Sequence, residues 1–162
     1  MIIGIDDYTE KTELRKLKGA VADADRVQRW IRTKFNGARI RNLRNSEAKR
    51  DSIIKELQGL STAQEIERDD PILIFYAGHG IEGNPPKEWH STWDSPKIQM
   101  IAPWDYGRSD SSGRAVEGIP DFTLGFLLRK IADSKGNNIV RPSCSPIDAY
   151  VTESFQDRKS VV

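Results

Sequence analysis

The apolar residues of the chain fall into two patterns, short continuous runs and runs with helical spacing. The run MIIGI at residues 1–5 is typical of a buried strand. In the segment after it, small and apolar side chains recur every three or four residues, which predicts a helix; they are Ala20, Ala24, Val27 and Ile31. The chain therefore begins with a strand that is followed by a helix.

The same alternation recurs in the middle of the chain. The segment ARIRNL, residues 38–43, predicts a second strand, after which Asn45 or Ser46 is placed to cap a helix. The apolar positions of that helix share one face, and they are Ile53, Ile54, Leu57 and Leu60. The basic residues between 39 and 44 are typical of a solvated edge. The continuous apolar run PILIFY at residues 71–76 then predicts a strand that is covered on both faces.

A third helix is predicted near the end of the chain. Pro120 and Asp121 are typical of a helix start, and Gly136 is typical of the position just after a helix end. The segment NNIV, residues 137–140, then begins a further strand. Strands that alternate with helices predict an α/β fold, in which a mostly parallel sheet carries helices on both faces.

Composition narrows the class of protein. The 162 residues fit one domain, and with 37% hydrophobic and 30% charged residues they are typical of a soluble globular protein with no membrane helix. The N-terminal residues lack the pattern of a secretion signal, so we expect a cytoplasmic or nuclear protein. A net charge of +1 gives no general attraction to nucleic acid or to membranes. One cysteine excludes an internal disulfide framework, and two histidines make a metal site unexpected.

The segment AGHG, which follows PILIFY, carries the leading candidate for chemistry. In open α/β sheets, sites lie at the carboxyl ends of strands, where His79 falls. Imidazole titrates near neutrality and can move a proton between a nucleophile and a leaving group. The glycines on either side let the chain turn sharply. A histidine that serves only the turn explains this local sequence equally well.

A nucleophile for His79 is less evident. The chain has no GxSxG motif, which disfavours a serine hydrolase, and no phosphate-binding loop. The only thiol is that of Cys144, 65 positions after His79. A cysteine and a histidine from separate strand ends form a common peptidase pair.

Five segments together resemble the caspase-like peptidase domain of metacaspases, particularly fungal ones. They are GIDDY, LKGAVADADRVQRWI, DDPILIFYAGHG, IAPWDY and GIPDFTLGFLLRKIADSKGNNI, in that order up to Ile139. The resemblance implies a caspase-like three-layer α/β/α sandwich over residues 1–139. It also implies hydrolysis of protein or peptide substrates after Arg or Lys by a Cys–His dyad, with no metal or cofactor in the chemical step. It leaves activation by calcium open.

The resemblance also implies roles for individual residues. His79 matches the histidine of the dyad, and the backbone N–H of Gly80 is placed to stabilise the oxyanion. Asp23 matches an acid of the substrate pocket, and Asp105 matches an acidic position at the edge of the site, so both are expected to bind substrate. A simple turn residue before Gly107 is an equally good interpretation of Asp105.

The chain departs from the family after Ile139. Relatives continue with an apolar strand and an Asp-x-Cys-His-Ser-Gly motif that holds the nucleophile, whereas residues 140–162 here form a divergent tail with neither feature. Cys144 lies near the expected position, but its neighbours do not match, and Pro142 and Pro146 oppose a central strand. Two hypotheses follow: a cysteine endopeptidase whose nucleophile motif is missing here, or a non-catalytic caspase-like module that binds or regulates. In both, the sheet is incomplete at its C-terminal side.

Overall fold

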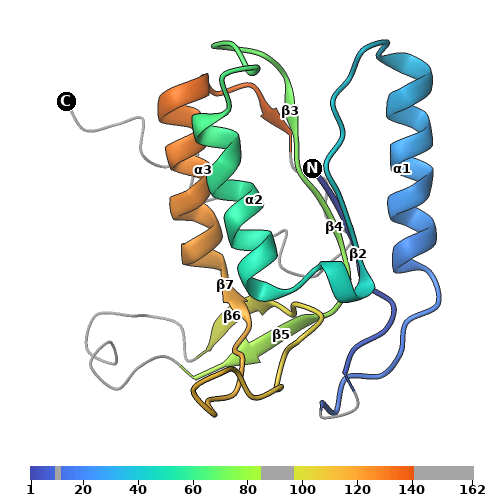
Figure 1. The fold of residues 1–162 in the computed structure, drawn as a ribbon, viewed down its shortest axis with the longest axis vertical. Helices are drawn as coiled ribbons and strands as arrows, with labels where there is room; N and C mark the ends of the chain where they lie inside the picture. Colours follow the sequence, from blue (N-terminus) through green and yellow to red (C-terminus); the bar gives the residue numbers. More distant parts are fainter. Residues whose placement is uncertain (10–11, 85–96, 141–162) are drawn as a thin grey trace.

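The computed structural model describes residues 1–9, 12–84 and 97–140. A parallel sheet lies at the centre, with one helix on one face and two helices on the other (Figure 1). These three layers confirm the predicted α/β/α sandwich with its mostly parallel sheet.

The parallel sheet is built from strands that the apolar runs predicted. Its order is β2-β1-β4, and β3 runs into β4 and pairs with β8. Hydrogen bonds to both neighbours continue through this junction, because the N–H of Ile74 donates to the carbonyl of Val140 at 3.0 Å. The strands are β1 (Ile2–Gly4), β2 (Asn42–Arg44), β3 (Ile72–Leu73), β4 (Phe75–Ala77) and β8 (Ile139–Val140).

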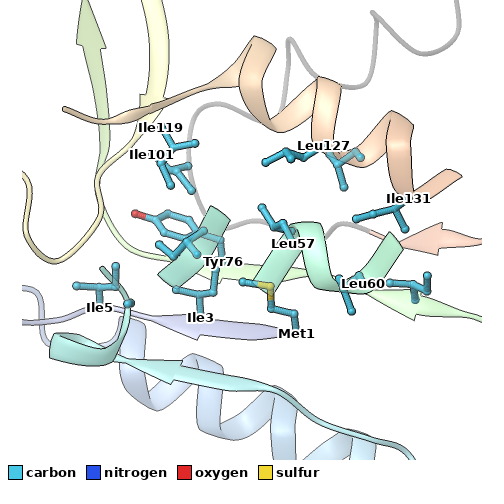
Figure 2. Packing of buried hydrophobic residues seen from close by; sticks show 14 residues of the cluster. Met1, Ile3, Ile5, Leu57, Leu60, Tyr76, Ile101, Ile119, Leu127 and Ile131 are labelled. Carbon is cyan, nitrogen blue, oxygen red and sulfur yellow. The ribbon is translucent and has the colours of Figure 1, made fainter. Parts of the chain in front are cut away.

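Alternate residues of each strand pack against opposite layers, as the pleat of a strand requires. Ile2 and Phe75 face α1 (Ala20–Lys34). Ile3 and Tyr76 face the other layer, which is formed by α2 (Arg50–Thr62) and α3 (Asp121–Lys135). Figure 2 shows this second core, where Ile3 and Tyr76 of the sheet lie opposite Leu57, Leu127 and Ile131 of the helices. The sheet is therefore buried on both faces.

A second, antiparallel sheet was not predicted from the sequence. It has the order β5-β6-β7, with β5 (Gly80–Gly83), β6 (Ile98–Ile101) and β7 (Ile119–Pro120). β5 starts directly after His79, so the histidine lies where the chain passes from the parallel sheet into the antiparallel one. β5 was hard to predict, because a strand that begins and ends with glycine has a weak apolar pattern.

The predicted caps of α2 are wrong. Asn45 belongs to a 3₁₀ turn, η1 (Asn45–Glu47), and α2 begins only at Arg50. The Asn45 side chain instead accepts the backbone N–H groups of Asp6 and Asp7, at 2.9 and 3.2 Å. It therefore ties the end of β2 to the loop after β1, where it cannot serve a helix.

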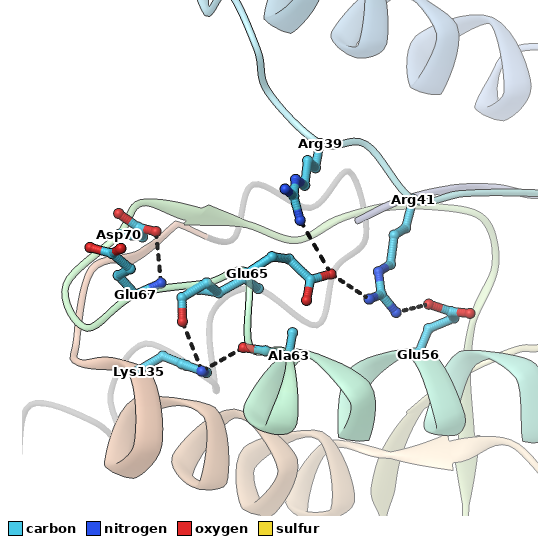
Figure 3. A network of polar contacts seen from close by, with 9 residues as sticks. Arg39, Arg41, Glu56, Ala63, Glu65, Glu67, Asp70 and Lys135 are labelled. Atoms are coloured by element: carbon cyan, nitrogen blue, oxygen red, sulfur yellow. Dashed lines mark hydrogen bonds and ion pairs between the residues drawn. The ribbon is translucent and has the colours of Figure 1, made fainter.

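Arg39 and Arg41 of the basic run are held in ion pairs (Figure 3). Arg41 contacts Glu56 at 2.7 Å and Glu65 at 3.6 Å, and Arg39 contacts Glu65 at 3.7 Å. Beside them Lys135, in the last turn of α3, donates to the carbonyl of Ala63 at 2.7 Å. These contacts support the interpretation of the run as a solvated edge. The contact of Lys135 also joins the ends of α2 and α3, since Ala63 is the capping residue directly after the last residue of α2.

Among the helices in the described part of the chain, none combines the length and the apolar character that a membrane span requires.

Candidate active site

The backbone of His79 is held at both of its polar groups. Its N–H donates to the hydroxyl of Tyr8 at 2.7 Å. Its carbonyl accepts the hydroxyl of Tyr76 at 2.9 Å and the N–H of Ala102 at 3.0 Å. These three contacts come from the loop after β1, from β4 and from the residue after β6. The position of the histidine is therefore fixed by both sheets.

The imidazole of His79 is oriented by a backbone carbonyl. Its Nε2 lies 2.7 Å from the carbonyl oxygen of Arg15, and its ring lies 5.1 Å from the ring of Tyr8 at an interplanar angle of 50°. A carbonyl only accepts hydrogen bonds, so the proton of this bond is on Nε2. In the neutral ring the lone pair is then on Nδ1. Nδ1 is therefore the nitrogen that can take a proton from a nucleophile.

Of the two tyrosines beside His79, Tyr76 is buried and Tyr8 is partly buried. Burial raises the pKa of Tyr8 above its usual value of 10, and it raises the pKa of Tyr76 further. Both hydroxyls therefore stay protonated at neutral pH and keep their hydrogen bonds. The hydroxyl of Tyr76 also lies 3.0 Å from the carbonyl of Ala102, so its single hydrogen is shared between the ends of β4 and β6.

Gly78 lies in a bend of the chain and is also required by packing. A Cβ at this position would lie 2.5 Å from the hydroxyl oxygen of Tyr76 and 2.8 Å from that of Tyr8. The chain bends at Gly78, as expected, although neither Gly78 nor Gly80 has a positive φ. The glycine before His79 also makes room for the two hydroxyl groups that hold the histidine backbone.

Gly80 presents its N–H away from the antiparallel sheet. Gly80 is paired with Ile101, and the hydrogen bond from Ala102 N–H to the His79 carbonyl lies just outside that pair. This pattern identifies the Gly80–Ile101 pair as one without hydrogen bonds between its members. Because backbone groups alternate along a strand, the N–H of Gly80 points to the side opposite β6. That direction suits the predicted oxyanion donor.

Asp105 has a structural contact that the turn interpretation did not include. Its carboxylate accepts the backbone N–H of Arg50, the first residue of α2, at 2.9 Å. A carboxylate at this position caps the helix and complements its dipole. Asp105 also lines a cavity of about 650 Å³ with Lys49, Arg108 and Arg114. His79 is absent from that lining, so the cavity is separate from the histidine.

Asp23 lies in the first turn of α1 and pairs with Arg26 at 2.7 Å. The segment from Arg15 to the start of α1 connects it to the histidine, because Arg15 contacts His79 and the carboxylate of Asp6 accepts the N–H of Ala20 at 2.8 Å. The side chain of Asp23 is half-exposed, and its role in a substrate pocket stays a prediction.

The remaining predicted site residue, Cys144, lies outside the described residues, as does every residue of the predicted tail except Val140, which belongs to β8. Within the part that the structure describes, no three metal-ligating side chains come together. The contacts that sequence reasoning missed are those of Tyr8, Tyr76 and Arg15. Both tyrosines stand inside the motifs GIDDY and IFYAGHG, whereas the carbonyl of Arg15 is a backbone group that leaves no trace in a sequence.

The fold and the placement of its histidine define a caspase-like α/β domain, and comparison with known proteins agrees. The family model for the caspase domain matches residues 1–111. The chain belongs to this family, and with it to the caspase-like peptidases. No curated protein matches the chain.

Among solved structures, the chain is similar to protein GSU0716 from Geobacter sulfurreducens, with a TM-score of 0.67 and 19% sequence identity. The similarity covers 89% of this chain and 48% of that one. The chain thus spans about half the length of this structural relative. At this identity the likeness concerns the fold alone.

Proposed function

We propose that the chain is the histidine-bearing part of a cysteine endopeptidase of the metacaspase type, which cleaves proteins after Arg or Lys. The observation that carries this proposal is the anchored imidazole of His79, with Nε2–H bonded to Arg15 and Nδ1 left to act as a base. An imidazole that served only a turn would need no such orientation. The adjoining N–H of Gly80 supplies the second part of the chemistry.

In this mechanism Nδ1 of His79 takes the proton of a cysteine thiol as the sulfur attacks the scissile carbonyl carbon. The carbonyl oxygen becomes an oxyanion, which the Gly80 N–H stabilises. The histidine then gives its proton to the leaving amine, and a thioester remains. Water hydrolyses the thioester with the same histidine as base, which regenerates the thiol. The Arg15 carbonyl stabilises the protonated imidazole in both stages because it accepts from Nε2–H throughout.

The thiol of this mechanism is the open part of the proposal. Cys144 is the one cysteine of the sequence, and its neighbours lack the Asp-x-Cys motif of the family. This difference favours a second candidate function, a non-catalytic caspase-like module that binds peptides or longer relatives without cutting them.

Alkylation kinetics separate the two candidates. A thiol activated by His79 reacts with iodoacetamide faster than a model thiol below pH 8, because part of it is thiolate. We expect His79→Ala to remove this excess rate and His90→Ala, which removes the other histidine of the sequence, to leave it intact. Equal rates in the unaltered chain and in His79→Ala would exclude Cys144 as the nucleophile and support the non-catalytic module.

A further inference from the structure

The outer edge of β5 is unpaired in the part of the chain that the structure describes. β5 is the first strand in the order β5-β6-β7, so it pairs with β6 on one side only. Because the Gly80–Ile101 pair is not hydrogen-bonded, Ile81 and Gly83 bond to β6. The N–H and carbonyl groups of Gly80 and Glu82 therefore point outward.

These outward groups have the geometry of an incomplete ladder. They recur every second residue, which is the repeat that an added strand needs. Within the described ranges no backbone hydrogen bond to another segment uses Gly80 or Glu82. The Glu82 carboxylate is engaged by Gln99 at 2.7 Å, so this edge offers backbone groups rather than a free side chain.

The edge begins at the candidate active site. Its first outward donor is the N–H of Gly80, which directly follows His79 in the chain. A peptide whose scissile carbonyl accepts this N–H is thereby placed at the start of the ladder. Edge strands bind extended peptides through main-chain hydrogen bonds that do not depend on sequence.

We infer that the outer edge of β5 binds the extended backbone of the peptide substrate by strand addition, with Gly80 at the scissile carbonyl and Glu82 two residues further on. The inference rests on the proposed peptidase function, since that function makes an extended peptide the ligand. It adds a positioning role for Glu82 that is carried by its backbone and not by its carboxylate.

Amide hydrogen exchange tests the inference directly. The probe is a ten-residue peptide, blocked at both ends, with a single central arginine, added at millimolar concentration to the ¹⁵N-labelled chain. We expect slower exchange at the amides of Gly80 and Glu82 and no change at Ile81, whose N–H already bonds to β6. Protection of all of these amides alike, or of none, overturns the inference.

Changes in the peptide and in the strand give a matched comparison. N-methylation of the peptide residue that donates to the ladder should weaken binding about three- to tenfold, the effect of one lost hydrogen bond, while N-methylation of the next residue should not. In the strand, Glu82→Pro removes an outward N–H and should weaken binding by a similar factor. Glu82→Ala is the control, because it removes the carboxylate but keeps the N–H, and it should leave binding nearly unchanged. Equal weakening by both variants contradicts the backbone role.

The outcomes distinguish this inference from the proposed function. Selective protection without peptide hydrolysis supports the edge as a binding site and argues against catalysis. Hydrolysis that depends on His79 but comes without protection at Gly80 and Glu82 overturns the inference and leaves the peptidase in place. The absence of both protection and hydrolysis overturns both.

Discussion

Tyr8 supports His79 through two separate contacts. Its hydroxyl accepts the His79 backbone N–H at 2.7 Å, and its ring lies 5.1 Å from the imidazole. The first contact helps to hold the histidine backbone, and the second places the tyrosine ring beside the imidazole at an angle of 50°. One side chain thus contributes both to the position of the histidine backbone and to the surroundings of its ring.

Tyr8→Phe keeps the ring contact and removes the acceptor. The His79 N–H is then left without its partner in a partly buried position, so we expect a loss of about 1–3 kcal/mol in the free energy of unfolding. Urea denaturation measures this loss. Tyr106→Phe is the control, because the Tyr106 hydroxyl has no hydrogen-bond partner among the described residues. A loss of the same size in the control would show that removal of a hydroxyl, and not of this contact, is responsible.

Gly78→Ala places a methyl group against both tyrosine hydroxyls. Because the new Cβ would lie 2.5 and 2.8 Å from them, the tyrosines must shift, at a cost of about 1–3 kcal/mol. Thermal unfolding checks the change. Gly125→Ala is the matched control: nothing lies within 4 Å of its new Cβ, and a helical alanine should stabilise α3 by about 0.5–1 kcal/mol. Similar shifts in both variants would contradict the packing role of Gly78.

Asp105 can be tested as a cap and as a substrate residue in one pair of variants. If the cap dominates, Asp105→Ala should lower the free energy of unfolding by about 0.5–2 kcal/mol, and Asp105→Asn, which keeps an acceptor, should recover most of it. Chemical denaturation of the two variants gives the answer. A raised KM for arginine substrates in Asp105→Asn, with stability unchanged, would favour the substrate pocket instead.

Tyr76 should make the fold sensitive to alkaline pH. Its pKa in the folded chain is raised by burial well above the value near 10 that it has in the unfolded chain. The neutral phenol therefore stabilises the fold fully below pH 10, and this stability is lost as pH rises above 10, by about 1.4 kcal/mol per pH unit. Urea titrations between pH 9 and 11 should show a shallower decline for Tyr76→Phe. An unchanged slope in that variant would contradict the assignment.

The hydrophobic pattern predicted the parallel sheet and its helices well because each of these elements has a local signature. The apolar positions from Ala20 to Ile31 and from Leu124 to Ile131 repeat with helical spacing, and PILIFY is continuous. The helix starts were harder to predict, since their hydrogen-bond partners are distant. The carboxylate of Asp6 accepts the N–H of Ala20, which is 14 residues away in the chain. The carboxylate of Asp105 accepts the N–H of Arg50, which is 55 residues away. A rule that looks for a cap next to the helix cannot find them.

The part of the candidate site that could be predicted is the part recognisable from its side chains. His79 stood out by its motif and by its place after a buried strand. The contacts around His79 could not be predicted from the sequence. The contact to Arg15 is made by a backbone carbonyl, and the outward direction of the Gly80 N–H follows from the strand register. The glycine before the histidine was noticed for the bend that it allows, but its packing role was not predicted. Only the positions of two tyrosine hydroxyls reveal why that residue has no side chain.

Because the Tyr76 hydroxyl contacts residues next to both sheets, the position of His79 depends on how the two sheets pack against each other. The Tyr76 ring is part of the core, while its oxygen joins the carbonyls of His79 and Ala102. A substitution in the core that rotates one sheet against the other must displace this oxygen, and through it His79, the proposed general base. Variants far from the histidine can therefore lower activity without touching the substrate, and screens for loss of function should recover core positions alongside those of the site.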